Sequence, residues 1–278
     1  MLICLPPSEG KTPAPDGAAP VDLARLTAAE HLTAQRRVVL EALAAASARP
    51  DATDLLGVGA SLGAEVARNT ELKAAPAAPA SRVYTGVLYA AAGLGDLPTE
   101  AADRAARDVR VFSGLWGAVS PADVIPAYRL SMGVDLPGVG KLATSWRPHL
   151  ASALDARAAG DVVVDCRSAA YLAAWKPATT GDAATDWVTV RVVRESDGKR
   201  TVVSHNAKHT RGVLTGHLLR RSGPAPTSGA QLLDAARELD GQVIGTEVGT
   251  GLSYRMVEAT LHDAATRRGP RTLEVVIA

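Results

Sequence analysis

Ser8 and Lys11 are the first residues whose types could do chemistry. They lie in the segment PPSEGKT, directly after the apolar run at residues 1–5. That run is expected to be a short buried strand, which the two following prolines end. A P-loop is excluded, because leucine stands where its first glycine should be, and Pro13 and Pro15 prevent the helix that would receive the phosphates. Two interpretations stay open: a surface turn, or a loop at a strand end that presents Ser8 and Lys11 to an anion.

Ser168 and Tyr171 form a second polar pair that follows a predicted strand, at residues 162–165. Ser168 either caps the next helix or lines a pocket together with Tyr171.

Arg129 is a third candidate, placed among apolar neighbours in the segment AYRLSMG. An arginine in that setting either bonds backbone carbonyls or offers its planar guanidinium to a phosphate or carboxylate. The residues alone do not separate these alternatives.

The strongest local signal is the segment 205–221, in which a helix is predicted over 207–221. Lys208 and Arg211 lie one turn apart on one face of that helix. The segment also holds Arg220 and Arg221 and contains no acidic residue. It therefore concentrates positive potential, and the alternative is a solvated basic face with no ligand.

The segment 113–125 (SGLWGAVSPADVI) contains a glycine-bracketed turn formed by Gly114, Trp116 and Gly117. Ser120 and Asp123 fit a capping box with proline at the first helical position, which predicts a helix over 120–125. The exposed amides of such a hairpin and helix start would favour a phosphate, as in a helix-hairpin-helix motif that binds a nucleic-acid backbone. Plain packing of a tight turn is the alternative.

Established catalytic and cofactor motifs are absent from the sequence. It has no G-x-S-x-G elbow and no H-E-x-x-H, and the run Gly57-Val58-Gly59 lacks the third glycine of a dinucleotide-binding loop. The histidines are scattered, and His205 and His209 have no accompanying carboxylate. We therefore expect no cofactor and no metal site. Whether the chain is an enzyme stays open.

Strands and helices interleave along the chain, which predicts a mixed α/β or α+β fold in a single domain over residues 1–278. Helices are expected at 21–48, 60–74, 99–108, 145–159, 207–221 and 229–240. Strands are expected at 1–5, 82–89, 109–112, 162–165, 187–193 and 201–204 and at the C-terminal end, with a hairpin turn at Asp197-Gly198.

The composition of the chain limits the classes of partner that it can bind. The 278 residues carry 30 Lys and Arg against 29 Asp and Glu, a formal charge of +1, which excludes a polybasic binder but not a local basic patch. One Phe and five Tyr are too few for a platform that stacks single-stranded bases. Two cysteines cannot staple a secreted scaffold, and no apolar run is long enough to cross a membrane. We expect a cytoplasmic protein with no membrane partner.

Taken in order, the blocks PPSEGKT, VYTGVLY (83–89), VFSGLWGAVSPADVIPAYRLSMG (111–133), DCRSAAYL (165–172), WKP (175–177) and SHNAKHTRG (204–212) resemble the bacterial peroxide stress resistance protein YaaA family. The resemblance implies a compact mixed fold with flanking helices, a basic cleft and a helix-hairpin-helix-like element. It also implies association with double-stranded DNA and protection against peroxide by limiting iron-driven oxidative damage.

Carried over to this sequence, the DNA or anion contacts would be Gly114, Trp116, Gly117, Ser120, Lys208 and Arg211. The shared polar residues would be Ser8, Lys11, Arg129, Ser168, Tyr171, Lys208 and Arg211. Two functions follow. The first is a stress protein that holds double-stranded DNA by its phosphates. The second is an enzyme acting on a small anionic substrate, for example one bearing phosphate, in a basic pocket formed at strand ends.

Overall fold

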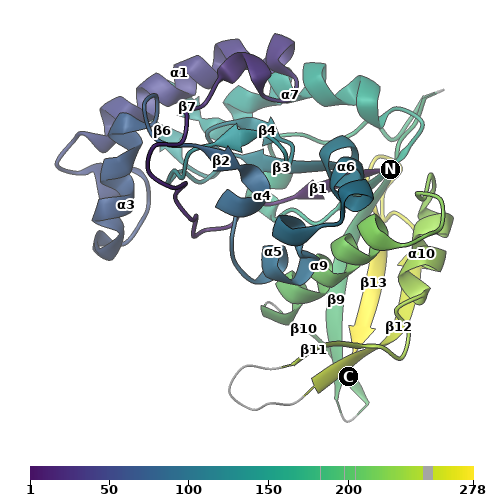
Figure 1. The fold of residues 1–278 in the computed structure, drawn as a ribbon. Coiled ribbons are helices and arrows are strands. Elements are labelled where there is room, and N and C mark those ends of the chain that lie inside the picture. The colour runs from purple at the N-terminus through teal and green to yellow at the C-terminus, as the bar shows by residue number, and fades with distance from the viewer. Residues whose placement is uncertain (182, 197, 204, 247–252) are drawn as a thin grey trace.

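A mixed sheet organises the chain (Figure 1). The computed structural model describes residues 1–181, 183–196, 198–203, 205–246 and 253–278. Its strand order is β11-β12-β13-β9-β8-β1-β3-β4, with β10 pairing to β9. The strands are β1 (Leu2–Leu5), β3 (Val109–Ser113), β4 (Gly117–Val119), β8 (Val162–Asp165), β9 (Asp186–Ser196), β10 (Lys199–Val202), β11 (Val243–Thr246), β12 (Ser253–His262) and β13 (Arg271–Ile277).

The middle of the sheet is parallel. Strand β1 runs parallel to both β3 and β8, with Leu5 opposite Val111 and Cys4 opposite Asp165. Strands β8 and β13 in turn run parallel to β9. The carboxyl ends of β1, β3 and β8 therefore meet at one edge of the sheet, where ligands commonly bind in α/β proteins. All four residues of β1 and of β8 are buried, as expected for strands covered on both faces.

Helices cover the sheet. In Figure 1, α1 (Ala29–Ser47) and α7 (Leu142–Ala158) lie together beside the β3–β4 part, while α9 (His205–Arg220) and α10 (Gly229–Arg237) lie beside the longer strands. Helix α5 (Val87–Ala92) packs on α9, and α6 (Thr99–Asp108) leads into β3. The short elements are α2 (Ala52–Leu55), α3 (Gly63–Ala67), α4 (Ala80–Val83), α8 (Ala169–Leu172), the 3-10 turns η1 (Leu23–Arg25), η2 (Ala60–Leu62), η3 (Arg68–Glu71) and η4 (Leu94–Asp96), and the strand pairs β2 (Ala78–Pro79) with β5 (Val124–Ile125) and β6 (Asp135–Leu136) with β7 (Gly140–Lys141).

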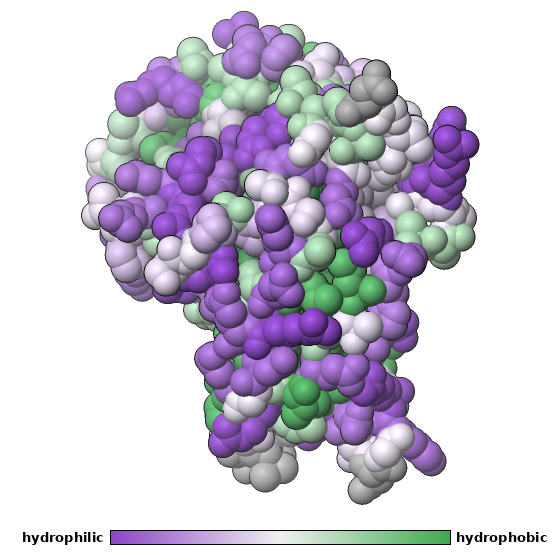
Figure 2. Space-filling model, turned by 90° about the vertical axis from the view of Figure 1, so that its right-hand side faces the viewer, coloured by the Kyte–Doolittle hydropathy of each residue, from purple (hydrophilic) through white to green (hydrophobic). Residues whose placement is uncertain are grey.

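The long strands extend below the body of the molecule as a narrower part. Figure 2 shows that this part carries hydrophobic spots among hydrophilic residues. Val202, Val243 and Val257 are exposed on β10, β11 and β12.

Within the described residues, no helix combines the length and the apolar character needed to cross a membrane.

The predicted fold class is confirmed: the structure is a mixed sheet with flanking helices. The predicted strands at 109–112 and 162–165, and the helices at 99–108, 145–159 and 207–221, each correspond to an observed element whose ends differ by at most three residues. Strands β9 and β10 form the expected hairpin, although Asp197 of its turn lies outside the described residues. The segment 82–89 was expected to be a strand, and this is wrong. It forms the end of α4 and the start of α5, separated by Gly86 at φ +112°.

The predicted helix over 120–125 is also wrong, and with it the helix-hairpin-helix in this segment. Residues 120–123 form a turn, and Val124–Ile125 pair with β2. The Ser120 amide does donate to Asp123 Oδ2 at 3.0 Å, as a capping box would require. The same carboxylate also accepts from the amide and hydroxyl of Thr27. Asp123 therefore links the turn at residues 120–123 to the distant segment that contains Thr27, and no helix begins here.

Candidate functional site

Two adjoining cavities lie at the carboxyl ends of β1 and β8. We call the first, of about 280 Å³, the Arg129 chamber, and the second, of about 410 Å³, the Lys208 chamber. Ser8, Glu9 and Tyr171 line both. The structure brings together the polar residues that the sequence singled out: Lys11 and Arg129 line the Arg129 chamber, and Ser168, Lys208 and Arg211 line the Lys208 chamber.

The loop after β1 is held in place by the segment 83–89. Ser8 Oγ accepts a hydrogen bond from the Thr85 amide at 3.0 Å and donates to the Gly10 carbonyl. The Tyr89 hydroxyl donates to the Pro6 carbonyl at 2.7 Å. These bonds explain why the two sequence blocks lie together. Because the Ser8 hydroxyl is already used in these hydrogen bonds, Ser8 contributes to the shape of the two chambers more than it offers a free hydroxyl to a ligand.

Lys11 lies on an aromatic floor. Its Nζ is 4.3 Å from the centre of the Tyr128 ring and donates to the Ser8 carbonyl at 2.9 Å. Burial, reinforced by the positive charge of Arg129, lowers the pKa of Lys11 to about 8. Lys11 therefore changes its protonation state close to neutral pH, which an ordinary surface lysine does not do.

Arg129 is the largely buried cation of its chamber. Its side chain is 13% exposed and forms ion pairs with Glu9 at 3.2 Å and Glu65 at 3.4 Å. Buried Asn69 fixes the backbone here: its side chain accepts from the Arg129 amide and donates to the Arg129 carbonyl, both at 2.9 Å. The backbone is therefore pinned at Arg129, while the guanidinium faces two carboxylates, one of them exposed.

The loop after β8 is fixed by a fully buried ion pair. Arg167 makes two hydrogen bonds to Asp165 and also donates to the Tyr171 carbonyl at 3.3 Å. Burial raises the pKa of Tyr171, although hydrogen bonds with Ser131 and the Met132 backbone act in the opposite direction, so the phenol stays protonated at neutral pH. Ser168 is exposed, and its hydroxyl makes no capping bond to α8, so the cap interpretation is not supported.

Helix α9 supplies the cations of the Lys208 chamber. Two nitrogens of Arg211 donate to the Val190 carbonyl, at 3.1 and 2.7 Å, which fixes the guanidinium against β9. Lys208 is exposed and, among the described residues, has neither an ion pair nor a hydrogen bond. The α5–α9 contact is close at Gly212, where an added Cβ would lie 2.3 Å from the Leu88 carbonyl oxygen. Close packing therefore sets the position of the two cations.

The glycine-bracketed turn is not part of this site. Gly114, Trp116, Gly117 and Ser120 are all buried. The Trp116 carbonyl accepts from buried Arg36 at 3.0 Å, and a Cβ on Gly117 would lie 2.7 Å from the Trp146 ring. The glycines serve close packing in a β-hairpin, and this turn presents no surface to a phosphate backbone.

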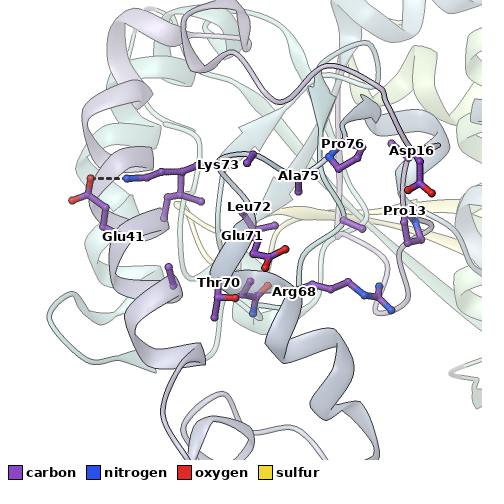
Figure 3. A pocket seen from close by; sticks show the side chains of 16 residues that line it. Pro13, Asp16, Glu41, Arg68, Thr70, Glu71, Leu72, Lys73, Ala75 and Pro76 are labelled. Carbon is purple, nitrogen blue, oxygen red and sulfur yellow. Dashed lines mark hydrogen bonds and ion pairs between the residues drawn. The ribbon is translucent and has the colours of Figure 1, made fainter.

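A larger cavity of about 650 Å³ lies apart from the predicted residues, between α1, η3 and the segment 74–76 (Figure 3). At its edge Lys73 pairs with Glu41 at 3.2 Å. Asn69 lines this cavity and also holds the Arg129 backbone. No sequence signal pointed to this larger cavity.

The described residues contain no group of three or more His, Cys, Asp or Glu side chains that could hold a metal ion.

Several residues that line the two chambers were not predicted from the sequence. Glu9 lies within the noted loop but was not singled out, although it lines both chambers. The run Gly57–Gly59, rejected as a dinucleotide loop, lines the Arg129 chamber. The apolar side chains of Val87 and Leu88 line the Lys208 chamber. Only the pairing of segments far apart in the chain reveals these roles.

Comparisons with known proteins agree on one family. A family profile described as peroxide stress protein YaaA matches residues 1–229. The UPF0246 protein of Streptomyces coelicolor is 47% identical over 245 residues, which cover 87% of this chain and 92% of that relative. The UPF0246 protein of Corynebacterium efficiens is 38% identical over 240 residues, which cover 85% of this chain and 92% of that relative.

Proposed function

This chain belongs to the YaaA family of peroxide stress proteins, and from that membership and the geometry of its two chambers we propose that it acts in the response to peroxide by binding a small anionic ligand. The observation that carries the proposal is the convergence of Lys11, Arg129, Lys208 and Arg211 on two adjoining cavities. A concave site with a few convergent polar groups is typical of small-molecule binding.

The chambers also hold groups suited to proton transfer, which supports an enzymatic form of the proposal. Lys11, with its pKa lowered to about 8, can give up or take a proton near neutral pH. The Tyr171 phenol, whose pKa is raised, stays a hydrogen-bond donor. In this role Arg129 holds the charge of the substrate, and Lys11 or Tyr171 handles a proton.

Calorimetry with inorganic phosphate and pyrophosphate tests the binding. Arg129→Gln and Lys208→Gln should each weaken binding by about tenfold, the loss expected for one charge-assisted hydrogen bond. Lys141→Gln is the matched control, because Lys141 is exposed on β7, away from both chambers. Failure of both anions to bind at millimolar concentration, or equal affinity in all four proteins, would overturn the proposal.

Double-stranded DNA is the second candidate partner, with limitation of iron-driven damage as the consequence of binding. The observation that favours it is Lys208, exposed and with no acidic partner among the described residues. The contact would use α9 and not the buried turn at Gly114. Duplex binding should then weaken steeply between 50 and 200 mM salt and weaken further in Lys208→Gln. Binding that is absent, or insensitive to salt and to this substitution, would reject DNA as the partner.

A further inference from the structure

We propose that the Lys208 chamber takes an amphipathic anion, that is, a ligand with an apolar, ring-sized body joined to a negatively charged group. This inference rests on the proposed function and names the chemistry of the ligand. Its basis is the lining of the chamber, which places an apolar wall and two cations around one cavity of about 410 Å³. The Glu9 carboxylate also lines this cavity, and its charge is paired with Arg129.

The apolar wall comes from the loop after β1 and from the start of α5. Pro6, Pro7 and Val87 line the chamber and are only partly buried, so their carbon atoms are in contact with solvent. The wall is rigid, because proline fixes its own backbone angle and the Tyr89 hydroxyl bonds the Pro6 carbonyl. A preformed apolar surface inside a cavity favours a ligand that covers it with carbon.

The charged side comes from α9. Lys208 and Arg211 lie one turn apart on that helix, and Arg211 is fixed by its two bonds to the Val190 carbonyl. Lys208 is exposed and has no partner among the described residues, so it is available to an anionic group. Helices α5 and α9 touch at Gly212, so the distance between the wall and the cations is fixed by packing.

The size of the chamber narrows the ligand further. A volume of about 410 Å³ lies in the range of small-molecule pockets, roughly 300–1,000 Å³, which accommodates a ring and a phosphate. The Ser168 hydroxyl lines the same chamber and makes no hydrogen bond with other described residues. It supplies one neutral polar contact for such a ligand.

The test compares phenyl phosphate with inorganic phosphate and with phenol by calorimetry. Phenyl phosphate should bind at least about tenfold more tightly than inorganic phosphate, while phenol alone binds weakly. Val87→Ser should bring the ratio of the two phosphate affinities toward one, and Lys208→Gln should weaken both. Val38→Ser, at an exposed position on α1, is the matched control and should keep the ratio of the unaltered protein. Melting curves and circular dichroism establish that each variant folds.

The outcomes separate this inference from the function on which it rests. If inorganic phosphate binds but phenyl phosphate is no tighter, or if Val87→Ser leaves the ratio unchanged in a folded protein, the amphipathic ligand is rejected and the anion site stands. If neither phosphate binds, the proposed function itself fails.

Discussion

The Glu9 carboxylate lies 3.2 Å from the Arg129 guanidinium at the boundary between the two chambers. The Glu9 side chain is 78% exposed, whereas that of Arg129 is 13% exposed. An exposed carboxylate therefore occupies the position at which a ligand's anionic group would meet the largely buried cation. A ligand must compete with Glu9, which suggests that Glu9 tunes the affinity of the site.

Replacing Glu9 with glutamine should strengthen phosphate binding several-fold, because Arg129 would lose one of its two competing carboxylates. Glu30→Gln is the control, since Glu30 is 70% exposed and pairs with His31 on α1. Calorimetry with inorganic phosphate measures the change. Weaker or unaltered binding in Glu9→Gln would show that Glu9 does not compete with the ligand.

Anion binding should depend on pH through Lys11. Its pKa, lowered to about 8, means that the ammonium loses its charge as pH rises through 8, so the affinity for an anion should fall between pH 7 and 9. Sulfate is the suitable probe because its own charge is constant over this range. In Lys11→Met the fall should disappear, and a fall of the same size in that variant would assign it to another group.

The lowered pKa of Lys11 also affects the free energy of unfolding. Between pH 8 and the ordinary lysine value of 10.5, the unfolded chain binds more protons at Lys11 than the folded chain does. The free energy of unfolding should therefore contain a contribution that rises with pH across this window. Urea titrations at pH 8 and pH 10 should show this contribution in the unaltered protein relative to Lys11→Met. An identical pH dependence in both proteins would contradict it.

Gly212→Ala should destabilise the fold by about 1–3 kcal/mol, the usual result of adding a methyl group to a packed interface. The new Cβ would lie 2.3 Å from the Leu88 carbonyl oxygen and 2.8 Å from Ala91 Cβ, so α5 and α9 would have to separate. Gly63→Ala is the control, because an added Cβ at that position meets nothing within 4 Å. Chemical denaturation compares the two, and equal stability would show that α5 and α9 adjust without cost.

Cys4 and Cys166 should resist oxidation although the family is linked to peroxide. Burial raises the pKa of both thiols, that of Cys166 to about 12, so little reactive thiolate forms. Alkylation of the folded protein followed by mass spectrometry should find both cysteines unmodified, with full labelling after denaturation. Rapid labelling or sulfenic acid formation at Cys166 in the folded protein would instead indicate a thiol-based role.

Local signals predicted the strands that carry the site. The apolar runs at β1 and β8 each end in a polar segment, so the sequence predicted Ser8, Ser168 and Tyr171 at strand ends, and the structure shows that these two strands are parallel neighbours. The acid-free segment on α9 likewise pointed to Lys208 and Arg211. Such signals depend on neighbours in the chain, which a sequence displays directly.

The features that the sequence did not predict depend on contacts between segments that are far apart in the chain. The residues RVYTGVLY have the composition of a strand, yet the chain is helical on both sides of Gly86, and α5 packs on α9. The glycines at 114 and 117 could have served a phosphate or close packing, and the choice depends on Trp146 and Arg36. The pairing of Glu9 with Arg129 likewise joins residues far apart in the chain and has no local signature.

The most direct test is a crystal structure of the full chain with phenyl phosphate. Density for the ligand is expected in the Lys208 chamber, with its phosphate in contact with Lys208 and Arg211 and its ring against Val87. A ligand found only in the larger cavity beside Asn69, or only on the outer surface, would show that these chambers do not bind a small anion.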